Sequence, residues 1–87
     1  MNGLEKEIES WLVESGIYPF SVLYVKDPQF LKISFFLESD ITEVLEKIRY
    51  KEMCDTSGVQ IIMETKTILF TGMGLINFLR YVDNQAI

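Results

Sequence analysis

Histidine is absent from this sequence of 87 residues, and cysteine occurs once, as Cys54. Histidine is the usual base beside a catalytic serine or cysteine and the commonest zinc ligand, so its absence excludes Ser-His and Cys-His nucleophiles and the usual zinc sites. A single cysteine forms neither an internal disulfide nor a cysteine metal cluster, and it suits a reducing compartment. We interpret Cys54 as a structural or incidental thiol. The sequence therefore predicts no enzyme, no metal site and no cofactor.

Basic side chains and long apolar runs are also scarce. Eight Lys and Arg stand against 13 Asp and Glu, and the resulting charge of -5 disfavours binding to a phosphate backbone. No stretch approaches the ~18 consecutive apolar residues of a membrane-spanning helix. The first seven residues lack the basic segment and apolar run of a secretory signal. We therefore expect a cytoplasmic protein that binds neither nucleic acid nor membrane.

Apolar residues, in contrast, are abundant. They make up 48% of the chain and aromatic residues 13%, which is enough for a chain of this length to bury a core. No linker or low-complexity tract divides the sequence, so we expect a single domain over residues 1–87. A core of this size gives marginal stability, and association commonly adds to it, so a homodimer is expected.

Three stretches repeat apolar residues with the period of an amphipathic helix. Their apolar positions are Leu4, Ile8, Trp11 and Leu12 in the first, Ile41, Val44, Leu45 and Ile48 in the second, and Leu75, Ile76, Phe78, Leu79, Tyr81 and Val82 in the third. The apolar positions of the third helix cover more than half of its circumference. That helix therefore needs cover on more than one side.

The ends of the first two helices carry recognisable signals. Asn2 followed by Glu5 is a variant of the capping box, and the charge of Glu5 also complements the helix dipole. Gly16 supplies the end of the first helix. Asp40 followed by Glu43 is a second capping-box pattern, so we predict that the second helix begins at Asp40.

Between the first two helices, two runs alternate in the manner of β-strands, over residues 20–25 and 30–37. Asp27-Pro28 predicts a hairpin turn that places Val25 opposite Phe30. This register predicts a core face made of Phe20, Val22, Tyr24, Leu31, Ile33, Phe35 and Leu37. The opposite face would hold Leu23, Val25, Phe30 and Phe36.

Residues 59–63 and 68–71 form a second pair of apolar runs. The segment between them contains no Gly, Asn or Pro, so turn chemistry does not indicate a hairpin. Cross-strand pairing favours one nevertheless. With its tip at residues 65–66, Ile61 would lie opposite Phe70.

The predicted fold is therefore α+β, in the order α-ββ-α-ββ-α. Two hairpins form a four-stranded, mainly antiparallel sheet, with helices packed on one face. This order and the acidic charge resemble those of the small dimeric chaperones of type III secretion effectors, which have one more strand and a longer chain. The resemblance rests on no motif and assigns no residue.

The strand over residues 30–37 is apolar on both faces, and only one of the three helices is extensively apolar. Covering both faces of the sheet within one small domain is therefore difficult, which leaves an apolar face for a partner. We predict a non-catalytic protein-interaction module, a homodimeric regulator or adaptor with chaperone-like binding. The predicted partner-binding residues are Leu23, Val25, Phe30, Phe36 and Tyr81.

One alternative stays open, the binding of a small molecule or nucleotide. Gly72 and Gly74 join a strand to a helix, and such a loop is able to present backbone N–H groups to a phosphate. The loop lacks the third glycine of a dinucleotide fingerprint and the Lys-Ser/Thr of a P-loop. A structural turn is the simpler interpretation of these glycines.

Overall fold

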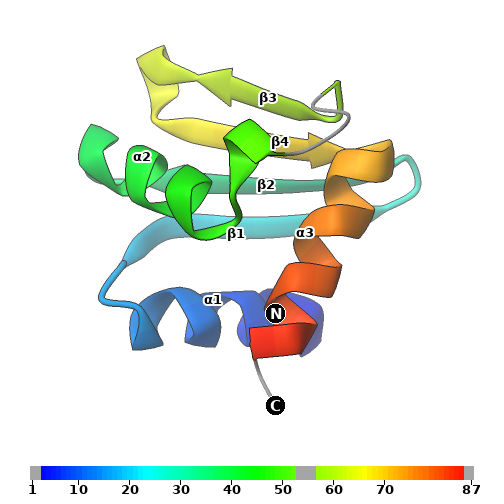
Figure 1. Ribbon diagram of the computed structural model, residues 1–87. Helices are drawn as coiled ribbons and strands as arrows, with labels where there is room; N and C mark the ends of the chain where they lie inside the picture. The colour runs from blue at the N-terminus through cyan, green and yellow to red at the C-terminus, as the bar shows by residue number, and fades with distance from the viewer. Residues whose placement is uncertain (1–2, 53–56, 86–87) are drawn as a thin grey trace.

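The computed structural model describes residues 3–52 and 57–85. The helices and strands are α1 (Gly3–Glu14), β1 (Pro19–Lys26), β2 (Gln29–Phe35), α2 (Glu38–Lys47), β3 (Val59–Ile62), β4 (Thr67–Thr71) and α3 (Gly72–Gln85), with the short 3₁₀ turns η1 (Tyr50–Glu52) and η2 (Met63–Thr65). The α+β fold and the order α-ββ-α-ββ-α are confirmed (Figure 1). The predicted helix cap at Asn2 and the thiol of Cys54 lie outside the described residues.

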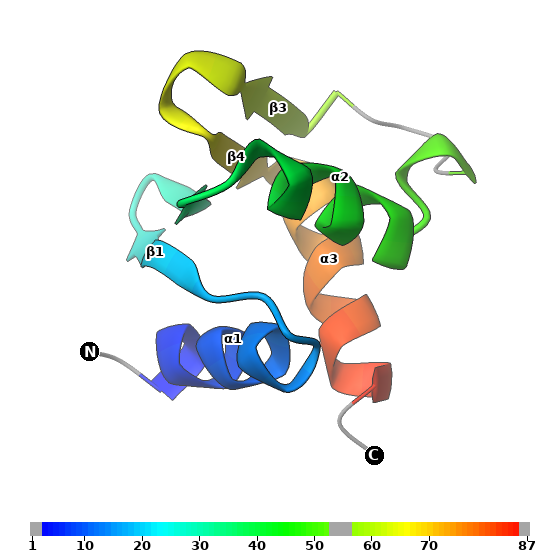
Figure 2. The same ribbon diagram turned by 90° about the vertical axis from the view of Figure 1, so that its left-hand side faces the viewer.

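The four strands form one antiparallel sheet in the order β1-β2-β4-β3, so β2 is an interior strand. Figure 2 views the sheet along its edge and shows α2 and α3 on the same side of it, with α1 beside β1. The core lies between these helices and the sheet. Its fully enclosed side chains are Ile8, Leu12, Ile17, Leu31, Ile33, Ile41, Val44, Ile68, Phe70, Leu75 and Phe78.

The β1-β2 hairpin has the predicted register, with Val25 opposite Phe30. The prediction that Phe20 and Leu37 belong to the core face is wrong. A bulge between Pro19 and Ser21 inserts Phe20 as an extra residue, which shifts the alternation, and its side chain is 67% exposed. Leu37 is 58% exposed because β2 has already ended and Leu37 precedes the first turn of α2.

The β3-β4 hairpin exists as predicted, but its register differs by two residues. Ile61 lies opposite Ile68 instead of Phe70. The connection is longer than a two-residue tip because it contains η2 and then Lys66 in the left-handed conformation, with φ of 52°. A shift of two residues preserves the faces of the strand, so Ile61 and Ile68 still point toward the core.

The first helix ends as predicted, and the second begins earlier than predicted. Gly16 has φ of 82°, which ends α1, and the Ile17 N–H donates to the Leu12 carbonyl at 2.9 Å. In α2, Leu37 stands at the cap position and makes no side-chain cap hydrogen bond. Asp40 lies inside the first turn, where its charge complements the helix dipole without capping the helix.

Glu5 does more than complement the dipole of α1. Its side chain is only 8% exposed, and its Oε2 accepts a hydrogen bond of 2.8 Å from the Tyr24 backbone N–H. Tyr24 belongs to β1, an edge strand, and backbone N–H groups on such an edge invite pairing with another chain. The Glu5 carboxylate therefore occupies one hydrogen-bonding position of this edge, and α1 lies alongside it.

We expect Glu5→Ala to lower the free energy of unfolding by about 2 kcal/mol, because it removes a charged acceptor from a partly buried N–H. Glu5→Gln keeps an oxygen acceptor and should lose less. Glu7→Ala, at an exposed position of the same helix, is the matched control and should leave stability unchanged. Urea unfolding followed by circular dichroism measures all three, and equal stability of the two alanine variants would contradict this role of Glu5.

The third helix follows β4 without a loop, beginning at Gly72. Its buried residues Leu75, Phe78 and Val82 face the core, while Ile76 is 40% exposed. Phe78 stacks on Phe70 of β4 with ring centroids 4.3 Å apart.

No helix among the described residues is long and apolar enough to cross a membrane.

Candidate functional site

The face of the sheet opposite the helices is the candidate site, and we call it the outer sheet face. Strand alternation and the observed pairing place eleven residues on it. They are Ser21, Leu23 and Val25 of β1, Phe30, Lys32 and Ser34 of β2, Thr67, Leu69 and Thr71 of β4, and Gln60 and Ile62 of β3. No described helix lies over this face, which is the left-hand side of the sheet in Figure 2.

The strand register arranges the outer sheet face in rows that cross the sheet. The middle row runs from Leu23 through Lys32 and Leu69 to Gln60. A second row begins with Val25 next to Phe30. Large apolar side chains therefore lie side by side on neighbouring strands and form a patch instead of isolated exposed residues.

The third row is polar, and its hydroxyl groups bond to one another. Ser34 Oγ lies 3.0 Å from Thr67 Oγ1, and the Thr65 hydroxyl donates to Thr67 Oγ1 at 3.0 Å. Thr67 is also buried. Ser34 and Thr67 thus satisfy hydrogen bonds within the face. Its apolar residues are less enclosed: Leu23 is 39% exposed, and Val25, Phe30, Ile62 and Leu69 are half-buried.

An exposed aromatic pair lies where β1 begins and β2 ends. The rings of Phe20 and Phe36 meet edge to face, 5.3 Å apart and at 90°, and Phe36 is 60% exposed. The bulge that removes Phe20 from the core brings it into this contact. Two exposed and mutually packed phenylalanines are a suitable anchor for a partner, because aromatic side chains dominate the binding energy of many interfaces.

Three of the five predicted partner-binding residues, Leu23, Val25 and Phe30, lie together on the outer sheet face. The fourth, Phe36, follows the last residue of β2, at the opposite end of the strand from Phe30, and its ring packs against Phe20. The fifth does not join them. Tyr81 is in α3, on the helix side, where its ring packs against Trp11 at a centroid distance of 5.9 Å. The outer sheet face also includes two residues that the sequence reasoning missed, Ile62 and Leu69. Leu69 is found only when β4 is known to lie next to β2.

The Gly72–Gly74 segment has a structural explanation. Gly72 adopts φ of 50°, which favours glycine, and Gly74 packs directly against the backbone of Gly58. A Cβ atom on Gly74 would lie 2.5 Å from the carbonyl carbon and oxygen of Gly58. These glycines therefore allow two backbone segments to touch, and the Gly58 backbone lies where the Gly74 side chain would otherwise project.

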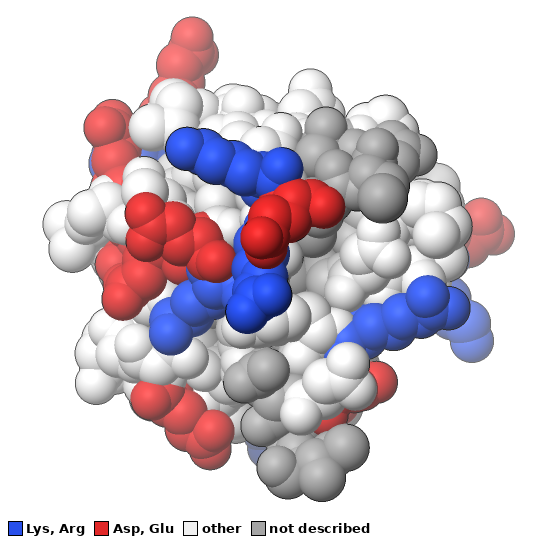
Figure 3. All heavy atoms as spheres, in the orientation of Figure 1, with Lys and Arg blue, Asp and Glu red and all other residues white. Residues whose placement is uncertain are grey.

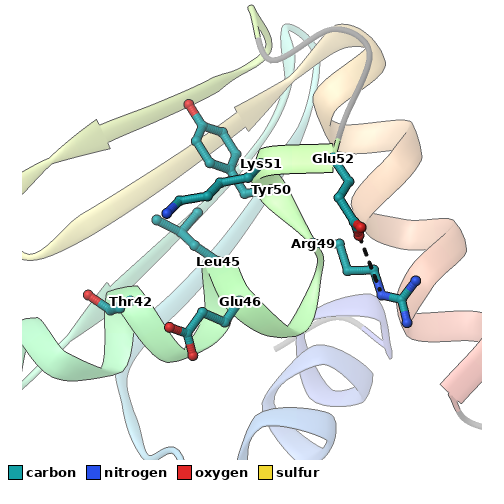
Figure 4. Close-up of a pocket in the computed structure, with 7 residues that line it drawn as sticks. All are labelled: Thr42, Leu45, Glu46, Arg49, Tyr50, Lys51 and Glu52. Atoms are coloured by element: carbon teal, nitrogen blue, oxygen red, sulfur yellow. Dashed lines mark ion pairs between the residues drawn. The ribbon is translucent and has the colours of Figure 1, made fainter.

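A hollow of about 440 Å³ lies at the end of α2, on the helix side of the molecule (Figure 4). Leu45 and Tyr50 contribute apolar surface to it, and Arg49 and Glu52 form an ion pair beside it, with 3.7 Å between Nε and Oε2. The basic residues Arg49 and Lys51 at this helix end are thus mixed with the carboxylates of Glu46 and Glu52. Figure 3 shows Lys and Arg next to Asp and Glu on this side of the molecule. Such a surface does not favour a polyanion.

Metal-binding groups of three or more His, Cys, Asp or Glu side chains are not found within residues 3–52 and 57–85. The charge of the outer sheet face comes from one residue, since Lys32 is the only charged member of its eleven residues.

Comparison with known proteins adds no assignment: no family model, no curated protein and no solved structure matches the chain.

Proposed function

We propose that this chain is a non-catalytic protein-interaction module that binds another protein through its outer sheet face. The observation that carries the proposal is the contiguous apolar surface formed by Leu23, Val25 and Phe30 on two neighbouring strands, on the side of the sheet without a described helix. A patch of this kind on a small protein marks an interaction site. A regulator or an adaptor acting in the cytoplasm fits this surface, as does chaperone-like binding.

The absence of histidine from the whole sequence supports a role without catalysis. Without histidine, a catalytic acid and base would have to be two carboxylates. One such pair, Glu38 and Asp40, lies in the first turn of α2. Their charges favour the positive end of the helix dipole there, which is a sufficient reason for their position.

Self-association is the second part of the proposal, and the β3 edge of the sheet supports it. The Thr71 N–H donates to the Gly58 carbonyl at 2.8 Å, so the alternation of an antiparallel ladder turns the backbone groups of Val59 and Ile61 away from β4. The strand Val59–Ile62 contains no charge and no proline to discourage pairing. Two copies pairing antiparallel along this edge would form a continuous eight-stranded sheet.

Sedimentation velocity together with binding of an apolar dye tests the proposal. At micromolar concentration the protein should sediment as a dimer and still bind the dye, because edge pairing leaves the outer sheet face open. The double variant Leu23→Ser with Phe36→Ser should keep its stability and bind the dye severalfold less. Val13→Ser is the matched control, since Val13 and Leu23 are each 39% exposed. A monomer that binds no dye would contradict the proposal.

Small-molecule binding at Gly72 and Gly74 is the alternative. A thermal-shift screen with nucleotides and phosphorylated metabolites tests it, because a ligand that binds the folded state raises the melting temperature. Stabilisation that is lost when Gly72 is replaced would favour this alternative over the interaction module.

A further inference from the structure

Lys32 stands in the middle of the outer sheet face, on an interior strand. Leu23 is its neighbour on β1 and Leu69 its neighbour on β4. Within residues 3–52 and 57–85 its ammonium group has no ion-pair partner. Whatever covers the apolar rows of this face therefore also covers or displaces this charge.

A second copy of the chain is poorly suited to cover this face. In a two-fold symmetric dimer the same patch meets itself, and the outer sheet face contains no carboxylate among its eleven residues. Face-to-face association would bring the two lysines into one apolar interface without a counter-charge. Burying an unpaired charge is strongly unfavourable, so self-association belongs to the β3 edge.

We infer that the outer sheet face receives an apolar helix of a different protein, and that this helix presents one Asp or Glu to Lys32. This inference rests on the proposed function and adds the chemistry of the partner. Strands are about 4.8 Å apart, so a four-stranded sheet offers a width of roughly 14 Å, which suits a single helix of about 10 Å diameter. Apolar side chains of that helix contact Leu23, Leu69 and Phe30, and its carboxylate pairs with the lysine.

The ion pair between Lys32 and the carboxylate of the partner helix contributes more to specificity than to affinity. A charged group in an apolar interface favours a partner of opposite sign and strongly disfavours a partner of the same sign. The Phe20 and Phe36 pair at the end of the sheet offers an aromatic anchor for the same helix. The partner is therefore recognised by an apolar stripe that is interrupted by one acidic residue.

Three synthetic helical peptides test this inference. They share one Leu- and Phe-rich face and differ at its central position, which is Glu, Gln or Lys. Fluorescence anisotropy at 0.15 M salt compares their affinities, because this ionic strength screens the long-range repulsion between the acidic peptide and the acidic protein. The Glu peptide should bind the wild-type protein about tenfold more tightly than the Lys peptide.

Variants of the protein assign the preference to Lys32. Lys32→Glu should reverse the order of the Glu and Lys peptides, and Lys32→Met should make their affinities similar. Lys6→Glu, on the exposed side of α1, makes the same charge change elsewhere and should preserve the order. Unchanged order in Lys32→Glu would overturn the inference.

A further variant separates this inference from the proposed function. If all three peptides bind equally and Leu23→Ser weakens each of them, the face is a docking surface without selection by charge, and only the inference fails. If none of the peptides binds, or if Leu23→Ser has no effect, the docking surface itself is rejected.

Discussion

Replacing Gly74 with alanine should lower the free energy of unfolding by about 3 kcal/mol, although alanine favours a helix. The added Cβ would lie 2.5 Å from two backbone atoms of Gly58, closer than van der Waals contact permits. Gly58 is held in place because its carbonyl accepts the Thr71 N–H at 2.8 Å. The backbone must therefore shift, and the gain in helix propensity of about 1 kcal/mol is outweighed.

Gly3→Ala is the control for this substitution. Gly3 opens α1, and a Cβ atom at this position would meet no atom within 4 Å. Urea unfolding of both variants should therefore give a large loss for Gly74→Ala and no loss for Gly3→Ala. Equal stabilities would mean that α3 and the start of β3 do not touch through their glycines.

The second large effect is expected at the centre of the core. Phe78→Ala should lower the free energy of unfolding by about 4 kcal/mol, because it removes a fully buried ring and leaves a cavity. This ring stacks on Phe70 and meets Trp11 edge to face at 5.7 Å, so it links α3 to both β4 and α1. Its loss affects the contacts of three elements at once.

Ile76→Ala provides the comparison on the same helix. Ile76 is 40% exposed, and its truncation should cost well under 1 kcal/mol. Phe78→Leu retains most of the buried volume and should lose less than Phe78→Ala, which keeps the measurement possible if the alanine variant does not fold. Thermal unfolding ranks the three variants, and a Phe78→Ala protein as stable as Ile76→Ala would contradict the assignment of Phe78 to the core.

These stability effects are separate from the proposed binding surface. Leu23 lies on the outer sheet face, whereas Phe78 is part of the core on the other side. Substitutions on the outer sheet face should therefore alter partner binding while leaving the unfolding free energy nearly unchanged. The contrast between the two groups of variants distinguishes an interaction site from a part of the core.

Sequence periodicity predicted the elements and the first hairpin because both depend on residues close together in the chain. A period of 3.6 identified the helices, and the Asp27-Pro28 turn placed Val25 opposite Phe30. The same reasoning failed where one residue changes the phase of the alternation, as at the Phe20 bulge. It also misplaced the β3-β4 register. Lys66 adopts the left-handed conformation in this turn, and no glycine in the sequence indicates that conformation.

The residues of the candidate site were likewise predicted where they depend on nearby positions in the chain, and missed where they depend on distant ones. Alternation along β1 and β2 was enough to group Leu23, Val25 and Phe30 on one face, because their positions follow from a single turn. Tyr81 was predicted as a partner contact because the apolar positions of its helix need cover on more than one side, and the fold places it against Trp11 instead. The contribution of Leu69 depends on β4 pairing with β2.

By itself the sequence determined the α+β class, the order of the elements and an apolar surplus larger than three helices easily cover. Only the tertiary structure decided that Leu69 of β4 joins this apolar face, that Glu5 bonds to the edge of β1, and that Leu23 and Leu69 flank Lys32. The physical reason is the range of the interactions. Periodicity and turn chemistry act over a few residues, whereas strand order, edge protection and the neighbours of a charge are set when distant segments pack together.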